Sequence, residues 1–231
     1  MTKILALSPH PDDVEFGCSG LLIKEAQKGS QIKILFFSRG EAGTKGTPES
    51  REQESRDAAK IIGAEVEFLN FGGDCHIEST PKNAITIAKQ IREFKPDIIL
   101  APQPEENQHP DHSAVSKIAR DAARLARYGG LEELKNLPAH KITALYFYAI
   151  TQDFGQRPDI VIDISDVYEQ WIKAINCHKS QMQGKNYQDL FTTRAHTLGS
   201  SIGVAYAQGL WVNEPLRLNY ISDINLSARN Y

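Results

Sequence analysis

The 231-residue sequence has no long apolar run and few cysteines, and both absences narrow what the chain can be. No stretch approaches the ~20 apolar residues that a membrane-spanning helix needs, and the N-terminus lacks the apolar core and cleavage site of a signal peptide. Cys18, Cys75 and Cys177 are odd in number and widely spaced, without a Cys-x-x-Cys pair. Neither a disulfide framework nor a thiolate zinc motif is indicated. We therefore expect a soluble protein of the reducing cytoplasm, with no membrane partner.

Charge of one sign is also lacking. The net charge is -3, with 26 basic and 29 acidic residues and no long run of either. A chain without a broad cationic field is not expected to gather phosphates, so nucleic acid is not a predicted partner. The loop after the first apolar run has no Gly-x-Gly-x-x-Gly, and its carboxylates would repel a pyrophosphate, which disfavours a nucleotide-binding protein.

What is present is the composition of an ordinary globular domain. Hydrophobic residues make up 41% of the chain and charged residues 24%, which is enough apolar surface for a sizeable core. The length fits one large α/β domain, and we find no internal repeat or convincing linker. We expect a single domain over residues 1–231.

Apolar runs alternate with stretches of helical period. Buried strands are predicted at residues 3–8, 32–38, 66–69, 98–102, 142–150 and 160–164. Helices are predicted at residues 16–28, 48–62, 81–94, 113–128, 167–181 and 192–208, the second of them capped by Thr47 and ended by Gly63. This order predicts a Rossmann-like, doubly wound α/β fold, whose mostly parallel sheet carries helices on both faces. Such folds bind ligands beyond the carboxyl ends of their strands.

The first chemical cluster directly follows the first predicted strand. Ser8-Pro9-His10-Pro11-Asp12-Asp13 packs one imidazole and two carboxylates into four residues, and the prolines favour a fixed turn. Taken alone, Pro-Asp-Asp is more often a turn with a helix cap.

The second cluster follows the strand at residues 98–102 and precedes a helix. It reads His109-Pro110-Asp111-His112, and alone it allows a simpler interpretation in which Asp111 or Ser113 caps the helix. Two such clusters at matching ends of parallel strands favour a metal site.

Catalytic zinc commonly takes three protein ligands from histidine and carboxylate. His10, Asp13 and His112 are the predicted ligands. Asp12 and His109 would then lie beside the open coordination position as an acid/base pair.

The two motifs resemble those of the LmbE-like, or PIG-L, family of zinc N-deacetylases. Four further segments resemble the bacillithiol-pathway branch, whose enzymes deacetylate N-acetylglucosaminyl malate: residues 12–17, the loop 39–49 with Arg51, and residues 177–181 and 202–207. The resemblance implies Zn2+ as cofactor, a small amino sugar as substrate and a homo-oligomer.

The resemblance also implies roles for the remaining cluster residues. Asp12 would take a proton from the attacking water, and a protonated His109 would stabilise the oxyanion that forms on the acetamide. Asp111 would hold His109 in its charged form, because a nearby carboxylate favours the imidazolium.

Arg51 and Glu41 are the predicted substrate contacts, since a guanidinium and a carboxylate both suit sugar hydroxyls or an anionic aglycone. Each has a plainer interpretation. Arg51 could pair with Glu49 or Glu54 on a helix surface, and Glu41 could be a solvated loop charge. His178 lies late in a predicted helix, where interaction with the helix dipole competes with substrate contact.

Two other functions fit the same clusters. One is an amidase or deacetylase for a different amino sugar, such as a thiol-sugar conjugate or a nucleotide sugar. The other is an inactive sugar-binding protein, which the presence of Asp12 beside a complete ligand set argues against. Residues 146–157 and 194–199 match no pattern of the bacillithiol branch, so the aglycone is open.

Overall fold

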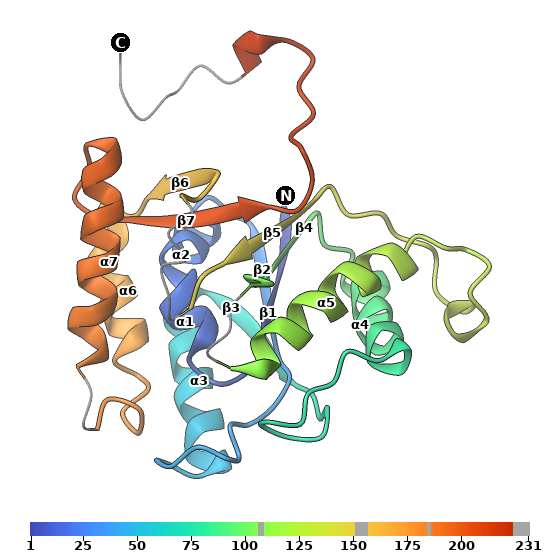
Figure 1. Cartoon of the computed structure of the whole chain (residues 1–231), viewed down its shortest axis with the longest axis horizontal. Coiled ribbons are helices and arrows are strands. Elements are labelled where there is room, and N and C mark those ends of the chain that lie inside the picture. The colour runs from blue at the N-terminus through green and yellow to red at the C-terminus, as the bar shows by residue number, and fades with distance from the viewer. Residues whose placement is uncertain (106–108, 151–156, 184–185, 224–231) are drawn as a thin grey trace.

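The computed structural model describes residues 1–105, 109–150, 157–183 and 186–223. A seven-stranded sheet in the order β3-β2-β1-β4-β5-β7-β6 is covered by helices on both faces (Figure 1). The strands are β1 (Lys3–Ser8), β2 (Gln31–Phe36), β3 (Ala64–Phe68), β4 (Ile98–Pro102), β5 (Ala144–Tyr148), β6 (Ile160–Asp163) and β7 (Ala207–Val212). The first five strands pair in parallel, and β7 runs antiparallel to both β5 and β6. The predicted α/β class and mostly parallel sheet are confirmed.

The helices divide between the two faces of the sheet (Figure 1). They are α1 (Asp13–Gly17), α2 (Ser19–Gln27), α3 (Pro48–Ile62), α4 (Pro81–Phe94), α5 (Pro110–Leu125), α6 (Tyr168–Ile175) and α7 (Tyr187–Ile202), with short 3-10 turns at Glu132–Leu134, Ser165–Val167 and Ile221–Asp223. Helices α4 and α5 pack on one face, whereas α1, α2, α6 and α7 lie on the other. No helix among the described residues is long and apolar enough to cross a membrane.

Strand β1 is buried on both sides, as its continuous apolar run predicts. Ile4 and Ala6 join the core beneath α2 and α6, while Leu5 and Leu7 join the core beneath α4 and α5. Alternate side chains of a strand point to opposite faces, so each face of β1 meets its own helical layer.

The local signals around α3 act as expected. The Thr47 hydroxyl accepts from the backbone N–H of Ser50, and Ser50 returns a bond to the Thr47 N–H, which completes a capping box. Gly63 ends the helix with a positive φ of 83°, a conformation that costs glycine little.

Three predicted helices differ from the structure. The helix expected at residues 16–28 is broken at Cys18, and the helix expected at 167–181 ends at Ile175. The helix expected at 192–208 ends at Ile202, because Gly203 takes a positive φ of 78°. The residues that follow form β7, which the sequence analysis missed.

The sheet order places a topological switch point beside β1. The chain leaves β1 for β2 on one side, and β4 returns to the other side of β1. The loops at the carboxyl ends of β1 and β4 therefore diverge onto opposite faces, which opens the position where such folds bind ligands. The single-domain assignment over residues 1–231 stays a prediction.

Candidate functional site

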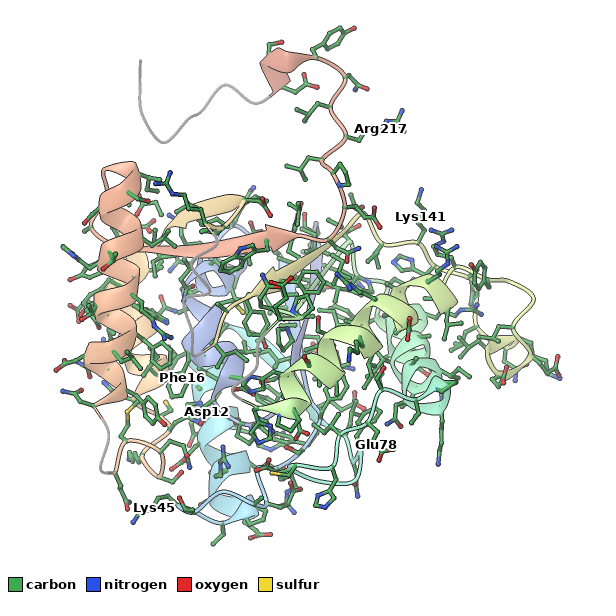
Figure 2. The ribbon with its side chains drawn as sticks, in the orientation of Figure 1. Asp12, Phe16, Lys45, Glu78, Lys141 and Arg217 are labelled. Atoms are coloured by element: carbon green, nitrogen blue, oxygen red, sulfur yellow. The ribbon has the colours of Figure 1, made fainter. Side chains whose placement is uncertain are left out.

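The two predicted clusters meet at this switch point. His10 follows the end of β1, and Asp12 lies at the start of α1 (Figure 2). The β1 turn is fixed by its own hydrogen bonds, since the Ser8 hydroxyl donates to the His10 carbonyl at 2.7 Å and the Ser38 hydroxyl donates to the Pro9 carbonyl at 2.9 Å. Asp12 takes a positive φ of 102°, an uncommon conformation for a residue with a side chain.

His10, Asp13 and His112 bring three donor atoms together. The Asp13 Oδ2 atom lies 3.0 Å from His10 Nδ1 and 3.3 Å from His112 Nε2, and all three residues are buried. Their ligand atoms lie within 4.8 Å of one another, so they could hold a metal ion. Two imidazoles and one carboxylate form a donor set typical of catalytic zinc.

Asp111 supports this group from behind. Its Oδ2 atom lies 2.9 Å from His10 Nε2 and accepts the backbone N–H of Cys75 at 2.8 Å, while its Oδ1 atom accepts the N–H of Ile77 at 3.3 Å. A carboxylate that holds the far nitrogen of a histidine fixes the ring's tautomer and orientation toward a metal. The nearest histidine to Asp111 is thus His10, because His109 Nδ1 lies 3.8 Å from Asp111 Oδ2.

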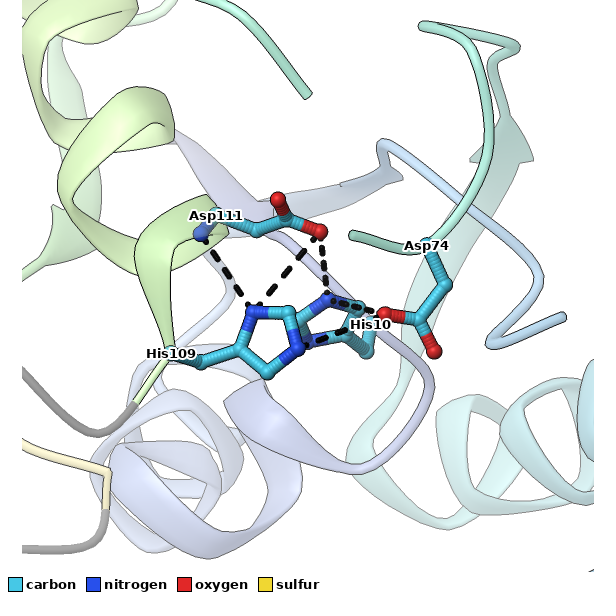
Figure 3. Close-up of side chains that lie close together, drawn as sticks. All are labelled: His10, Asp74, His109 and Asp111. Carbon is cyan, nitrogen blue, oxygen red and sulfur yellow. Dashed lines mark hydrogen bonds and ion pairs between the residues drawn. The ribbon is translucent and has the colours of Figure 1, made fainter. Parts of the chain in front are cut away.

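Asp74 is a site residue that the sequence analysis missed. Figure 3 shows it beside the rings of His10 and His109, with its Oδ1 atom 3.2 Å from His10 Nε2 and 3.4 Å from His109 Nε2. It lies in the loop after β3, another carboxyl end at the same edge of the sheet. The pair Gly72-Gly73 just before it could have marked a tight approach of this loop to the site, since both glycines take positive φ.

The adjacent carboxylates of Asp12 and Asp13 have opposite pKa shifts. Burial and the charge of Asp13 raise the pKa of Asp12 to about 7, although the Arg51 guanidinium opposes the rise. Burial alone would raise the pKa of Asp13, but the imidazoles of His112 and His10 outweigh it and hold that pKa far below the usual range. One carboxyl is suited to exchange a proton near neutral pH, and its neighbour to stay ionised.

His109 begins α5 and is partly accessible. Its Nδ1 atom accepts the backbone N–H of Asp111 at 3.3 Å. Burial and the neighbouring His10 lower the pKa of His109, and the carboxylates of Asp111 and Asp74 offset this only in part. The predicted protonated state of His109 stays a prediction.

Arg51 points inward, toward the backbone of the site loops. Its guanidinium is buried and donates to the carbonyls of Gly40 at 2.9 Å and Pro11 at 3.0 Å, and it lies 3.5 Å from Asp12 Oδ2. A Cβ atom on Gly40 would lie 2.1 Å from Arg51 Nη1, so only glycine leaves room for this contact. Arg51 thereby ties the loop at residues 39–43 to the Asp12 turn.

Glu41 links two loops of the same edge. Its carboxylate accepts the backbone N–H of Arg39 at 3.1 Å and that of Asp74 at 2.9 Å. Direct substrate contact by Arg51 and Glu41 stays a prediction, and both residues have a definite positioning task.

His178 is completely buried rather than placed on a helix surface. It lies beyond the end of α6, with Nε2 3.2 Å from Glu15 Oε1, and Glu15 is equally buried. Burial would lower the pKa of His178, but the charges of Glu15, Asp12 and Glu54 outweigh it and raise the pKa. His196, by contrast, is exposed and contacts the Tyr206 ring. Of the segment 146–157, which matches no pattern of the bacillithiol branch, residues 151–156 lie outside the described residues.

The raised pKa of His178 predicts a pH-dependent stability. The proton on His178 stabilises the folded chain fully below the unfolded value of ~6.5, and this stabilisation is lost as the pH rises through the higher folded pKa. Urea unfolding midpoints of wild type and His178→Gln should therefore converge as the pH rises, while His196→Gln should track the wild type. A constant gap between wild type and His178→Gln would contradict the assignment.

Comparison with known proteins agrees with this geometry. Residues 5–123 match the family described as PIG-L, GlcNAc-PI de-N-acetylase. The chain is 29% identical over 224 residues to the diacetylchitobiose deacetylase of Thermococcus kodakarensis, covering 90% of this chain and 82% of that protein. It is 25% identical over 230 residues to the 4-oxalmesaconate hydratase of Pseudomonas putida, covering 89% of this chain and 87% of that protein. It is 24% identical over 196 residues to a probable N-acetyl-α-D-glucosaminyl L-malate deacetylase of Bacillus cereus, covering 78% and 84%. The matched segment contains both histidine–aspartate motifs, and the chain belongs to the PIG-L family of de-N-acetylases.

Proposed function

We propose that the chain is a zinc-dependent N-deacetylase that hydrolyses the acetamide of an N-acetylglucosamine conjugate, with N-acetylglucosaminyl malate as the leading substrate. The observation that carries the proposal is the convergence of His10, Asp13 and His112, with Asp12 next to this donor set. A metal-binding protein without catalysis would not need a second carboxyl whose pKa is about 7.

His10 Nδ1, Asp13 Oδ2 and His112 Nε2 would hold the zinc ion. When bound, the ion supplies a Lewis acid that polarises the acetamide carbonyl and activates water. Asp111 keeps His10 in the tautomer that points its Nδ1 lone pair at the site, through the 2.9 Å contact at Nε2. Before a cation binds, Asp13 and Asp111 raise the pKa of His10 against its burial, so zinc and a proton compete for this ring.

Asp12 is the proposed general base. Its carboxylate accepts a proton from the attacking water and later delivers a proton to the leaving amine, a task that favours a pKa near the working pH. Arg51 holds the carbonyl of Pro11 and faces the Asp12 carboxylate, so the turn presents the base in one direction.

His109 is the proposed donor to the oxyanion. Its ring is partly accessible, at 29% of the side chain, whereas the ligand His112 is at 4%. Its Nδ1 atom accepts the Asp111 N–H, so the ring carries a proton on Nε2, the atom proposed to donate to the oxyanion. Asp111 is therefore proposed to serve both His10 and His109.

The choice of substrate rests on resemblance. Residues 39–51, 177–181 and 202–207 resemble the bacillithiol branch, and the Bacillus cereus relative carries the matching name. The Thermococcus relative supports the wider class of N-acetylglucosamine conjugates. We propose a cytoplasmic enzyme that acts on a small sugar as a homo-oligomer.

Substrate assays test the proposed activity. Zinc-loaded wild type should release acetate from N-acetylglucosaminyl malate faster than from free N-acetylglucosamine or diacetylchitobiose, and Asp12→Asn should abolish release while retaining the metal. Turnover of diacetylchitobiose alone would keep the deacetylase and discard the malate conjugate. Absence of acetate release from all three substrates would contradict the deacetylase proposal.

Two substitutions separate metal binding from oxyanion stabilisation. His109→Ala should lower kcat by ~10²–10³, the typical cost of losing one oxyanion donor, and should keep stoichiometric zinc. Asp13→Asn should lose zinc, because the substitution removes the negative charge of the proposed ligand that lies between the two histidine ligands. Atomic emission measures the zinc content of each variant, and kinetic assays measure its kcat. Zinc loss in His109→Ala with zinc retention in Asp13→Asn would contradict the assignment of Asp13 as ligand and His109 as oxyanion donor.

A further inference from the structure

Asp74, Cys75 and His109 form a second group of donor atoms, next to the first. The Cys75 Sγ atom lies 3.5 Å from Asp74 Oδ1 and 3.5 Å from His109 Nε2, and the third side of the triangle, from Asp74 Oδ1 to His109 Nε2, is 3.4 Å. Zinc bonds of ~2.0–2.3 Å in a tetrahedral site place neighbouring ligand atoms ~3.3–3.8 Å apart. The triangle thus already has the edge lengths of one face of a zinc tetrahedron.

This triangle shares no atom with the proposed catalytic ligand set. That set uses His10 Nδ1, Asp13 Oδ2 and His112 Nε2, whereas the second group faces the opposite nitrogen of His10, Nε2, at 3.2 Å from Asp74 Oδ1. The carboxylates of Asp74 and Asp111 together with the His10 and His109 rings also satisfy the spacing of a metal cluster. That cluster shares His10 with the catalytic set, whereas the triangle of Asp74, Cys75 and His109 uses none of the three catalytic ligands.

The backbone holds the three donors in place. The N–H of Asp74 donates to Glu41 at 2.9 Å, and the N–H of Cys75 donates to Asp111 at 2.8 Å. Cys75 takes a positive φ of 69°, which is uncommon for a residue with a side chain and keeps its thiol on the His109 side. Backbone strain at a residue whose side chain faces two potential ligands points to a task for that side chain.

The ring of His109 can present Nε2 as a ligand. Its Nδ1 atom accepts the backbone N–H of Asp111 at 3.3 Å, which places the ring proton on Nε2 in the free protein. Binding of a cation at Nε2 therefore requires this proton to move to Nδ1, which faces the Asp111 carboxylate at 3.8 Å. Cys75 is exposed and Asp74 is buried, which leaves the outer side of the triangle open for a water as fourth ligand.

We propose that Asp74, Cys75 and His109 bind a second, thiophilic divalent cation, Zn2+, and that this ion inhibits the enzyme. On binding, the Cys75 thiol loses its proton to solvent and coordinates as thiolate, a soft ligand that favours zinc over magnesium or calcium. The ion takes the Nε2 lone pair of His109 and so removes that ring from proton donation. Inhibition rests on the proposed function, whereas binding of the second ion does not.

A cadmium titration tests the site directly. Protein holding one zinc ion is titrated with Cd2+ while the thiolate-to-cadmium charge-transfer absorption is followed, and Zn2+ stoichiometry is measured by equilibrium dialysis. Wild type should bind one further ion with this absorption. Cys75→Ser should lose the absorption and weaken the second Zn2+ by at least the ~10–100-fold typical of losing an outer-shell partner. The matched control Cys177→Ser should behave as the wild type.

Asp74→Asn provides an independent variant that keeps the thiol. It should weaken the second ion as well, because one of three ligands is lost. An unchanged affinity for the second ion in Cys75→Ser, or a single bound ion in the wild type, would overturn the site.

In the acetate assay, excess Zn2+ should inhibit wild type more strongly than Cys75→Ser, and equal inhibition would overturn the inhibitory role. A second ion bound by a protein that releases no acetate from any substrate would leave the site standing and refute only the proposed function.

Discussion

The site depends on carboxylates that stay ionised although they are almost completely buried. Asp13 and Asp111 are buried, and a buried carboxylate is costly unless it is paired and hydrogen-bonded. Here each lies against histidine: Asp13 against His10 and His112, and Asp111 against His10. These contacts require the ends of β1 and β4 to be neighbours, which the sheet order provides. They also require the loop after β3 to pack against the start of α5, because the Asp111 carboxylate accepts its remaining hydrogen bonds from the N–H groups of Cys75 and Ile77.

The same constraint separates two adjacent carboxylates into different tasks. The Asp13 oxygen meets two imidazoles and is held ionised, whereas burial and the charge of Asp13 raise the pKa of Asp12 to about 7 against the more distant Arg51 guanidinium. Asp12 takes a positive φ directly before Asp13 begins α1, so a single turn supplies both a candidate ligand and a candidate base. Pairs of carboxyls whose environments drive their pKa values apart are typical of hydrolytic sites.

The sequence predicts the frame of the site because its signals are local. Apolar runs define the parallel strands, and the carboxyl ends of parallel strands align, so the meeting of His10 with His112 follows from β1 and β4 alone. Thr47 and Gly63 bound their helix for equally local reasons. The sequence did not predict strand β7, because no residue before Gly203 marks the end of the helical pattern of α7.

Partners that come from other loops could not be read from motifs. Asp74 reaches the site only because its loop packs against α5, and Glu15 and His178 meet across distant segments. Arg51 shows the limit of charge patterns. Spacing along α3 favours a surface pair with Glu54, yet Glu54 binds the N–H and hydroxyl of Ser180, and Arg51 turns inward to the carbonyl of Gly40.

The most direct test of the account is anomalous X-ray diffraction at the zinc edge from crystals of wild-type protein holding one zinc ion. The account predicts a single peak within bonding distance of His10 Nδ1, Asp13 Oδ2 and His112 Nε2, with Asp12 outside the coordination sphere. A peak among Asp74, Cys75 and His109 instead, or one coordinated by Asp12, would contradict the assignment of ligands and base on which the proposed deacetylase depends.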